Sequence, residues 1–600
     1  MAESTPIYPV AAARAMLAIA WRADPVRAVL TAALVALQAV FGSLFALWLA
    51  LLVNGVRAHQ SVEVTSAAAL VALSIAGATG LDVLANRLRA AFNDRVQHLV
   101  ERTLLETVGR APTLDLQENP EHVLQIELLE AEGWEFGQVI PSLVDLLSIA
   151  VRSVIAAVLL YSVSPLLLLL PLFGLPALLM SPITGDLFAK GGDLAAEPSR
   201  RSTDLFELAT GAPGAKEMRI FRLADETLFR FHHNRDQVRK IYVRLAWRNG
   251  LMGVGAQLVF VAGYVGAIGV SVALVDRHQV NVGAVVLTAV LAGQVLGLVT
   301  GSASMLQWAG RTLRTAGRYL RIVRVAEGAR FHVARELPPP DRLRSGIRLE
   351  RVSYRYPGAT GDALHEFDLD LPAGSVVAVV GENGAGKTTL VKLLSGLQRP
   401  TSGRILVDGV DLNRFDPELW RQRLSAAFQD HGRFEFVLQE AVGVGWLPNL
   451  ENSTEVMRAL DRAAAHELVS GLPRGISTQL GPAWPDGVDL SGGQWQKVAL
   501  ARAMMRNAPL LLLLDEPAAA LDADAERRLF ESWMTRAQSL GKSVGAVTIL
   551  ISHRLSTVRR AERIVVLADG RLAEEGDHSQ LLRLGGIYAE LFRLQAAAYR

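Results

Sequence analysis

A glycine-rich stretch, GENGAGKTT at Gly381–Thr389, has the residue types and spacing of a phosphate-binding loop. It follows the apolar run SVVAVV at 375–380 and opens into LVKLLSG, where apolar residues recur at helical spacing. The stretch is therefore predicted to connect a buried strand to the N-terminus of a helix. Backbone N–H groups at such a place can surround an anion, and the helix dipole favours its negative charge.

The residues of this loop have distinct predicted roles. Lys387 is expected to reach the β- and γ-phosphates of a nucleotide, and the Thr388 hydroxyl is expected to be a Mg²⁺ ligand. The glycines let the backbone curl so that its N–H groups point inward. The residues predicted to contact the nucleotide here are Gly381, Glu382, Asn383, Gly384, Ala385, Gly386, Lys387, Thr388 and Thr389.

Two carboxylates, Asp515 and Glu516, follow a run of five leucines at Leu510–Leu514. Leucine favours helix, but the short run between Pro509 and Pro517 predicts a fully buried parallel strand. Carboxylates at the end of such a strand face the crevice in which α/β folds bind phosphates. We expect Asp515 to hold Mg²⁺ through water and Glu516 to orient or deprotonate the attacking water.

Further polar positions accompany this core set. Tyr356, in RVSYRYPG, is either a ring that stacks on adenine or a strand tyrosine in a core. Gln429 follows a short apolar strand, and LSGGQ at Leu490–Gln494 is a second glycine-rich loop that opens a helix, hence a second anion site. Asp522 in AAALD and His553 at the end of VTILISH complete the set.

Composition indicates a membrane protein of several domains. The chain has 600 residues, 50% of them hydrophobic, which is too apolar for a soluble enzyme of this size. A net charge of +2 provides no field that would attract nucleic acid, and we expect no nucleic-acid partner. The absence of cysteine excludes disulfides, thiolate metal sites and a catalytic thiol.

Six apolar stretches predict membrane spans, preceded by a short interfacial helix at about Val10–Trp21. The expected spans are Val26–Val56, Ala67–Asn86, Pro141–Val163, Pro165–Phe188, Gly250–Val275 and Val282–Met305. The third and fourth are separated by a tight turn at Ser164, because one continuous helix would be far longer than a bilayer is thick. Arginines flank the first span on its N-terminal side and follow the second, which places both the N-terminus and the C-terminal part in the cytoplasm.

The predicted fold has two parts: an all-α six-span transmembrane domain with long cytoplasmic helical extensions, followed by an α/β P-loop ATPase domain. We expect an N-terminal interfacial helix at 1–25, the membrane domain at 26–330, a linker at 331–346 and the nucleotide-binding domain at 347–600. Three prolines in 336–344 end any helix there. Two polar segments of helical period, at 87–135 and 189–248, are expected to turn back near 116–122 and 210–215. They are interpreted as cytoplasmic levers that contact the nucleotide domain. The alternative is that they are ordinary solvated helical hairpins.

The order Tyr, GENGAGKTT, Gln, LSGGQ, LLLLLDEP, ALD, ISH resembles that of the ATP-binding cassette (ABC) superfamily. With six spans ahead of it, nearly the whole chain resembles an exporter-type half-transporter. The resemblance implies that two nucleotide domains sandwich two ATP molecules. The residues given roles across or within that dimer are Ser491, Gly492, Gly493 and Gln494 facing the partner's nucleotide, Gln429 sensing the γ-phosphate and Mg²⁺, Asp522 spanning the dimer, and His553 contacting the γ-phosphate.

This resemblance implies ATP-driven export across the cytoplasmic membrane by alternating access, with ATP and Mg²⁺ as cofactors. The cargo is expected to be hydrophobic or amphipathic; the aromatic pattern FQDHGRFEF at 428–436 hints at a peptide natural product, and lipids or drugs stay open. A non-transport ABC ATPase and an importer are alternatives that the fused spans disfavour. Since no required residue is substituted, a homodimer is favoured and a heterodimer stays open.

One segment departs from the family pattern, and one charged residue within a predicted span needs a partner. The segment TQLGPAWPDGVD at 478–489 has Gln479 and Pro482 where glutamates are expected, which puts the contact to the levers in doubt. Arg152 lies midway along the third span, where a charge must face the bundle interior, a watery cavity or a partner. Either glutamines at 38, 257 or 294 bond it and fix packing, or it lines the translocation path for an anionic cargo.

Overall fold

The computed structural model describes residues 9–331, 337–517, 523–554 and 558–598. The chain forms two compact units. The first comprises Met1–Leu105 and Glu127–Arg321, and the second comprises Glu106–Ile126 and Ile322–Arg600. The segment Glu106–Ile126, which contains the connector predicted near 116–122, therefore belongs to the same unit as the C-terminal part of the chain.

The first unit is helical throughout its described residues. Its helices, including those that continue beyond it, are α1 (Pro9–Ala23), α2 (Pro25–Arg57), α3 (Ser61–Gly109), α5 (Pro120–Glu132), η1 (Gly133–Gln138), α6 (Val139–Val163), η2 (Pro165–Gly174), α7 (Leu175–Thr210), α8 (Ala212–Ile220), α9 (Ala224–Asp276) and α10 (Gly283–Phe331). Six stretches among the described residues are long and apolar enough to cross a membrane. The chain is accordingly a multi-pass membrane protein, and α1 is the short helix predicted ahead of the first span.

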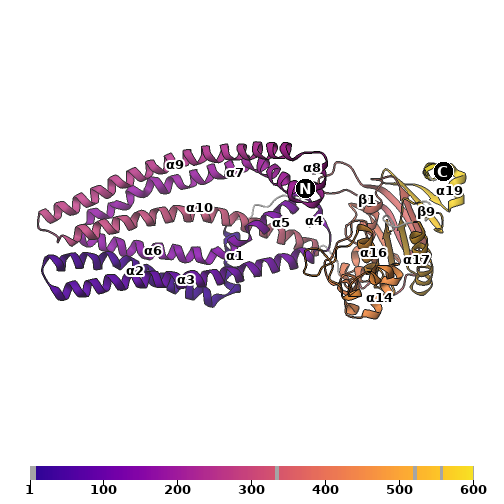
Figure 1. Ribbon diagram of the computed structural model, residues 1–600, viewed down its shortest axis with the longest axis horizontal. Helices are drawn as coiled ribbons and strands as arrows, with labels where there is room; N and C mark the ends of the chain where they lie inside the picture. Colours follow the sequence, from indigo (N-terminus) through magenta and orange to yellow (C-terminus); the bar gives the residue numbers. More distant parts are fainter. Residues whose placement is uncertain (1–8, 332–336, 518–522, 555–557, 599–600) are drawn as a thin grey trace. The chain divides into compact units, whose positions relative to one another are not determined.

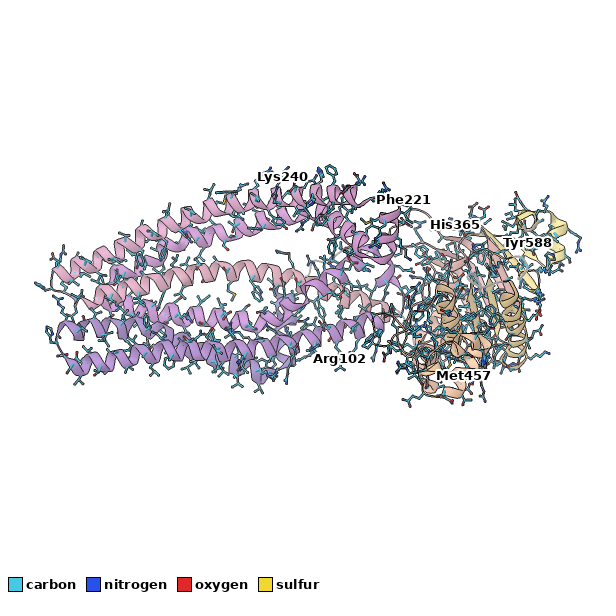
Figure 2. All side chains as sticks on the ribbon, in the orientation of Figure 1. Arg102, Phe221, Lys240, His365, Met457 and Tyr588 are labelled. Carbon is cyan, nitrogen blue, oxygen red and sulfur yellow. The ribbon has the colours of Figure 1, made fainter. Side chains whose placement is uncertain are left out.

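The long helices pack in pairs. α7 packs against α9 along much of its length, and α2 packs against α6 (Figure 1). Close approach is possible where residues are small: a Cβ on Gly263 of α9 would lie 2.4 Å from the ring of Phe173. Beyond the apolar part of this pair, Phe221 follows α8 with 64% of its side chain exposed, and Lys240 lies on α9 (Figure 2).

The turn predicted between the third and fourth spans is confirmed, but the fourth span begins differently from expectation. α6 ends at Val163, and Ser164 is extended, with its hydroxyl accepting the N–H of Leu166. The next ten residues, η2, form a 3₁₀ helix instead of an α-helix. Pro171 lies inside this stretch, where it lacks an N–H and its ring obstructs regular i→i−4 bonding, and the α-helical pattern resumes at Leu175.

Two of the glutamines that were expected to bond Arg152 have other hydrogen-bond partners in the structure. Gln38 donates to Asp82 at 2.9 Å, and Gln294 donates to the Gly42 carbonyl at 3.1 Å. The nearby carboxylate of the third span, Asp145, pairs with Arg89. Arg152 is half-buried, and its Nε has no hydrogen-bond partner among the described residues. Two of the three glutamines proposed as its partners are thus engaged elsewhere.

The second unit is built on two sheets. An antiparallel sheet has the order β2-β1-β4-β5, and a six-stranded sheet has the order β10-β9-β3-β8-β7-β6. Their strands are β1 (Gly346–Tyr354), β2 (Leu364–Pro372), β3 (Val376–Gly381), β4 (Ser402–Val407), β5 (Val410–Asp411), β6 (Leu424–Ala427), β7 (Leu511–Asp515), β8 (Val547–Ile551), β9 (Arg563–Ala568) and β10 (Arg571–Gly576). In the larger sheet all neighbours are parallel except β10, which runs antiparallel to β9.

Helices cover both faces of the larger sheet. The helices of this unit are α4 (Asp115–Glu118), α11 (Lys387–Leu394), α12 (Pro417–Gln422), α13 (Leu438–Gly443), α14 (Ser453–Arg462), α15 (His466–Ser470), α16 (Gly492–Ala503), α17 (Ala523–Val544), α19 (His578–Leu584) and α20 (Ile587–Ala598), with 3₁₀ turns η3 (Leu412–Arg414), η4 (Leu447–Asn449) and η5 (Gly475–Ser477). The leucine run is strand β7, as predicted, and every one of its residues is buried. Leu511 and Leu513 join the core that contains α11, whereas Leu512 and Leu514 join the core that contains α16 and α17. Burial on both faces explains why a strand without polar alternation forms here.

Candidate nucleotide-binding site

The carboxyl ends of four adjacent parallel strands meet at one edge of the larger sheet. In the registers, Val379 of β3 and Asp515 of β7 both pair with Ile551 of β8, and Ala427 of β6 pairs with Leu514. Each strand is followed directly by residues singled out in the sequence. The segments at 381–389, 429, 515–516 and 553 are therefore brought to one edge by strand order alone.

These segments line a single open pocket of about 570 Å³. The residues that line it are Tyr356, Ala363, Asn383, Gly384, Gly386, Lys387, Thr388, Thr389, Gln429, Asp515, Glu516 and His553. All except Ala363 were selected from the sequence. Gly381, Glu382 and Ala385 belong to the same loop without lining the pocket among the described residues, and Asp522 lies outside the described part of the chain.

The glycine-rich loop has the backbone that its sequence predicts. Gly386 caps α11 with φ +101, in the left-handed region. A Cβ at this position would also lie 2.7 Å from the Ala363 carbonyl oxygen, so only glycine fits. Ala363 had no signal of its own in the sequence, because its place beside the loop depends on the strand that follows it.

Lys387 is folded over its own loop. Its ammonium donates to the carbonyl oxygens of Gly381, at 2.8 Å, and Glu382, at 2.7 Å, and the residue is only 8% exposed. Burial lowers the pKa of Lys387, while the charges of Glu516 and Asp515 oppose that change. The ammonium thus rests on two neutral oxygens that charged phosphate oxygens can replace with a stronger interaction.

The oxygen ligands present suit a magnesium ion. Thr388 Oγ1 and Asp515 Oδ2 are 3.5 Å apart, and the Gln429 side chain lines the same pocket. Asp515 is 3% exposed; burial, followed by the neighbouring charge of Glu516, raises its pKa to about 6. A bound cation would stabilise the charged carboxylate and so oppose this shift. No group of three or more His, Cys, Asp or Glu side chains that could hold a metal exists within the described residues, so such an ion would need oxygens from nucleotide and water.

Glu516 is held in an unusual backbone conformation. Its φ is +48, its N–H donates to the Ile551 carbonyl at 3.0 Å, and its own carbonyl accepts the side chain of Gln496 at 2.9 Å. Its carboxylate pairs with Nε2 of His553. Gln496, from α16, was missed in the sequence because nothing there distinguishes it from a surface glutamine.

The second glycine-rich loop caps a helix and lies outside the pocket. Ser491 is the N-cap of α16: its hydroxyl accepts the N–H of Gln494, and its N–H donates to the Gln494 side chain at 2.8 Å. Gly492 and Gly493 form the first turn of the same helix. None of these four residues lines the pocket of its own chain among the described residues, and their contact with a partner's nucleotide stays a prediction.

The altered segment at 478–489 packs against the aromatic segment at 428–436. Gln479 donates to the carbonyl of Glu435 at 2.8 Å and pairs across a β-bridge with Val437. Phe434 of the aromatic segment lies under the guanidinium of Arg502, 4.0 Å from the ring centroid. The glutamine at 479 therefore has a structural partner within its own unit.

Comparison with known proteins identifies one domain of the chain. Residues 364–519 match the family model described as ABC transporter. These residues form an ABC transporter domain. The chain is 42% identical over 260 residues to the human mitochondrial potassium channel ATP-binding subunit, covering 43% of this chain and 34% of that protein. It is 33% identical over 389 residues to the ATP-dependent lipid A-core flippase of Methylobacillus flagellatus, covering 64% of this chain and 62% of the flippase.

The fold of the chain is similar to that of a solved ABC exporter. A structure of a bacterial Atm1-family ABC exporter with ATP bound matches with a TM-score of 0.76 and 24% identity, covering 96% of this chain and 99% of the other. The curated relatives, in contrast, are matched over about one third to three fifths of their length. The similarity to the exporter structure thus establishes the arrangement of a fused membrane part and ATPase domain, and the ABC transporter domain implies that the chain binds ATP.

Proposed function

We propose that this protein hydrolyses ATP to drive the export of a hydrophobic or amphipathic substrate across the cell membrane by alternating access. The observation that carries the proposal is the single pocket in which a phosphate-binding loop, two carboxylates and a histidine converge. The described residues of the same chain include six helices that are long and apolar enough to span a membrane. A phosphoryl-transfer site joined to a membrane domain is the combination that such transport requires, with the ATPase domain in the cytoplasm.

The residues of the pocket fit the demands of phosphoryl transfer, which are mainly positioning and charge stabilisation. Lys387 would leave its two carbonyl partners and hold the β- and γ-phosphates. Glu516, paired with His553, would orient the attacking water and accept its proton, and His553 would also reach the γ-phosphate. Thr388, Gln429 and Asp515, the last through water, would hold Mg²⁺, which would neutralise phosphate charge.

We further propose that two copies of this chain form the working transporter. Ser491–Gln494 cap a helix outside the pocket, which leaves them available for the nucleotide of a second copy. Every position required for hydrolysis carries a competent residue, so a homodimer would have two active sites. Size-exclusion chromatography with light scattering on the purified chain with ATP tests this proposal. The mass of two chains supports the homodimer, whereas the mass of one chain would favour pairing with a different partner.

A pocket in the membrane unit supports a hydrophobic cargo. It has a volume of about 290 Å³ and lies among α6, η2, α7 and α10. Its lining is apolar apart from two serines: Ser153, Ala156, Ala157, Leu160, Leu168, Pro171, Leu178, Val295, Leu298, Val299 and Ser302. A site of this kind suits an alkyl or aromatic portion with few polar groups.

A lipid is the second candidate cargo, favoured by the relatives named lipid A-core flippases. The peptide alternative rests only on the aromatic pattern at 428–436, and that segment lies in the nucleotide-binding unit. Reconstitution in liposomes containing a fluorescent phospholipid tests the lipid reading. ATP-dependent loss of label from the cytoplasmic-side leaflet supports it. ATP hydrolysis without lipid movement, together with uptake of a hydrophobic drug or peptide, would assign export of another cargo.

Arg152→Gln is expected to retain folding and basal ATP hydrolysis while abolishing stimulation by an anionic amphipathic cargo. The reason is that Arg152 lies midway along the third span, where a charge is costly without a partner, and two of the glutamines proposed to bond it are engaged elsewhere. A cargo carboxylate or phosphate would supply the opposite charge. The measurement is ATPase activity in nanodiscs with an anionic cargo and its uncharged analogue. Loss of the folded protein in detergent would contradict this expectation and assign Arg152 a packing role.

A further inference from the structure

A carboxylate of the connector at 106–126 binds the helix that follows the phosphate-binding loop. Glu118, at the end of α4, accepts Nζ of Lys392 at 2.6 Å on one oxygen and Nε2 of Gln398 at 2.7 Å on the other. Both side chains of the ion pair are largely shielded, with Glu118 20% and Lys392 22% exposed. Since both carboxylate oxygens are bonded, the position of Lys392 depends on that of Glu118.

Hydrogen bonds to the backbone just before α4 attach this helix to the rest of its unit. The N–H of Leu114 donates to the Leu397 carbonyl at 2.9 Å, and Arg421 donates to the Pro112 carbonyl at 2.9 Å. Leu116 is 2% exposed. The two hydrogen bonds just before α4 and the burial of Leu116 within it hold in place the turn that carries the Glu118 carboxylate.

Lys392 also contacts the tyrosine predicted to stack on the adenine base. Its Nζ lies 3.4 Å from the Tyr356 hydroxyl and 5.2 Å from the ring centroid. The same hydroxyl is hydrogen-bonded to Thr389 Oγ1 at 3.1 Å. Tyr356 and Thr389 both line the nucleotide pocket, whereas Lys392 lies outside the set of described residues that line it.

The remaining neighbours of Tyr356 fix the plane of its ring. Tyr354 packs edge-on against it, with centroids 4.9 Å apart and an interplanar angle of 85°. Burial would lower the pKa of Lys392, but the hydrogen bond and charge of Glu118 outweigh it and the pKa is raised. Lys392 therefore stays charged at neutral pH and can hold the tyrosine hydroxyl and ring at once.

We propose that Lys392 is a positioning residue for Tyr356 and that Glu118 controls it, so that recognition of the nucleotide base is linked to the connector at 106–126. The inference rests on the proposed binding of ATP. α3 ends at Gly109, so the connector is covalently continuous with a helix that contains a predicted span. A movement of Glu118 would release Lys392 and loosen the ring, changing the affinity for the base while leaving the phosphate contacts of Lys387 intact.

The test compares ATP with inorganic tripolyphosphate, which lacks a base, on the full-length protein with Mg²⁺. Lys392→Met is expected to weaken ATP about 3- to 10-fold, the effect of losing one charge-assisted hydrogen bond, and to leave tripolyphosphate affinity unchanged. Tyr356→Phe, which keeps the ring and removes the hydroxyl, should give a similar loss. The double variant should lose no more than either single one. Lys542→Met, at an exposed position of α17, is the matched control.

Equal losses for ATP and tripolyphosphate would overturn the inference, because Lys392 would then act on the phosphates through its charge. Additive losses in the double variant would overturn it also. Failure of the parent protein to bind ATP would instead overturn the proposed function and this inference with it. Thermal unfolding of each variant separates loss of binding from loss of fold. If Lys392→Met is unstable, Tyr356→Phe tests independently whether the bond between the two side chains contributes to ATP affinity.

Glu118→Gln tests control by the connector. It keeps the size of the side chain and removes its charge, and it is expected to reproduce the loss of ATP affinity without a loss for tripolyphosphate. Glu467→Gln, an exposed position on α15, is the control. Unchanged ATP affinity in Glu118→Gln, alongside a loss in Lys392→Met, would overturn the role given to Glu118.

Discussion

Glu516→Gln is expected to slow ATP hydrolysis by roughly 10²- to 10⁴-fold, the usual contribution of a positioned general base. Glutamine has the same shape and can still accept a hydrogen bond from His553, but it cannot accept the proton of the attacking water. The contacts predicted for phosphate binding come from the loop at 381–389, Gln429, His553 and the second glycine-rich loop of a partner, and they do not involve this carboxylate. ATP affinity should therefore be retained, and two ATP-bearing domains should stay associated.

The measurement is ATPase activity in nanodiscs combined with equilibrium binding of ATP to the same preparation. Glu531→Gln is a matched control, because Glu531 is an exposed carboxylate on α17 that pairs with Arg560. Hydrolysis by Glu516→Gln within a few-fold of the parent would show that the role given to Glu516 is wrong.

Lys387→Ala is expected to weaken binding of ATP with Mg²⁺ by roughly 10- to 100-fold, as the loss of charge-assisted bonds to phosphate implies. The ammonium is buried at the start of α11 and reaches the loop carbonyls in the absence of nucleotide. Its charge acts on the bound phosphates in the ground state as well as in the transition state, so affinity falls together with rate.

Equilibrium dialysis with labelled ATP measures this loss directly, and Lys542→Ala serves as the surface control. Unchanged affinity in Lys387→Ala would contradict the predicted contact. A fall in hydrolysis with no fall in affinity would restrict Lys387 to the transition state.

The parts of the fold that the sequence predicted are those set by short-range pattern and burial. The leucine run before Asp515 is a strand because both of its faces are covered, and the flanking prolines signalled its length. The break at Ser164 could be predicted because a single helix containing both apolar runs would be far longer than a bilayer is thick. The 3₁₀ helix that follows could not be predicted, since a proline inside an apolar run is equally compatible with a kinked α-helix.

Contacts between distant segments were beyond sequence reasoning. Glu118 and Lys392 are 274 positions apart, and each resembles an ordinary charged residue of a helix surface. Likewise, the glutamines proposed for Arg152 were chosen by type and depth alone, and two of them bond to Asp82 and to a backbone carbonyl. The site residues could be predicted because they follow strands in a recognisable order. The bond from the Gln496 side chain to the Glu516 carbonyl and the place of Ala363 beside Gly386 are revealed only by the folded chain.

Because the backbone of Glu516 is left-handed, stability and activity favour different residues at this position. A non-glycine residue at φ +48 carries conformational strain of about 1 kcal/mol, and the surrounding sheet must compensate for it. Asparagine tolerates this conformation better than glutamate does. Selection of random variants for heat resistance alone would therefore enrich asparagine at 516, yielding a sturdier protein that no longer turns over ATP. Thermostability engineering of this chain has to hold position 516 constant and seek its gains elsewhere.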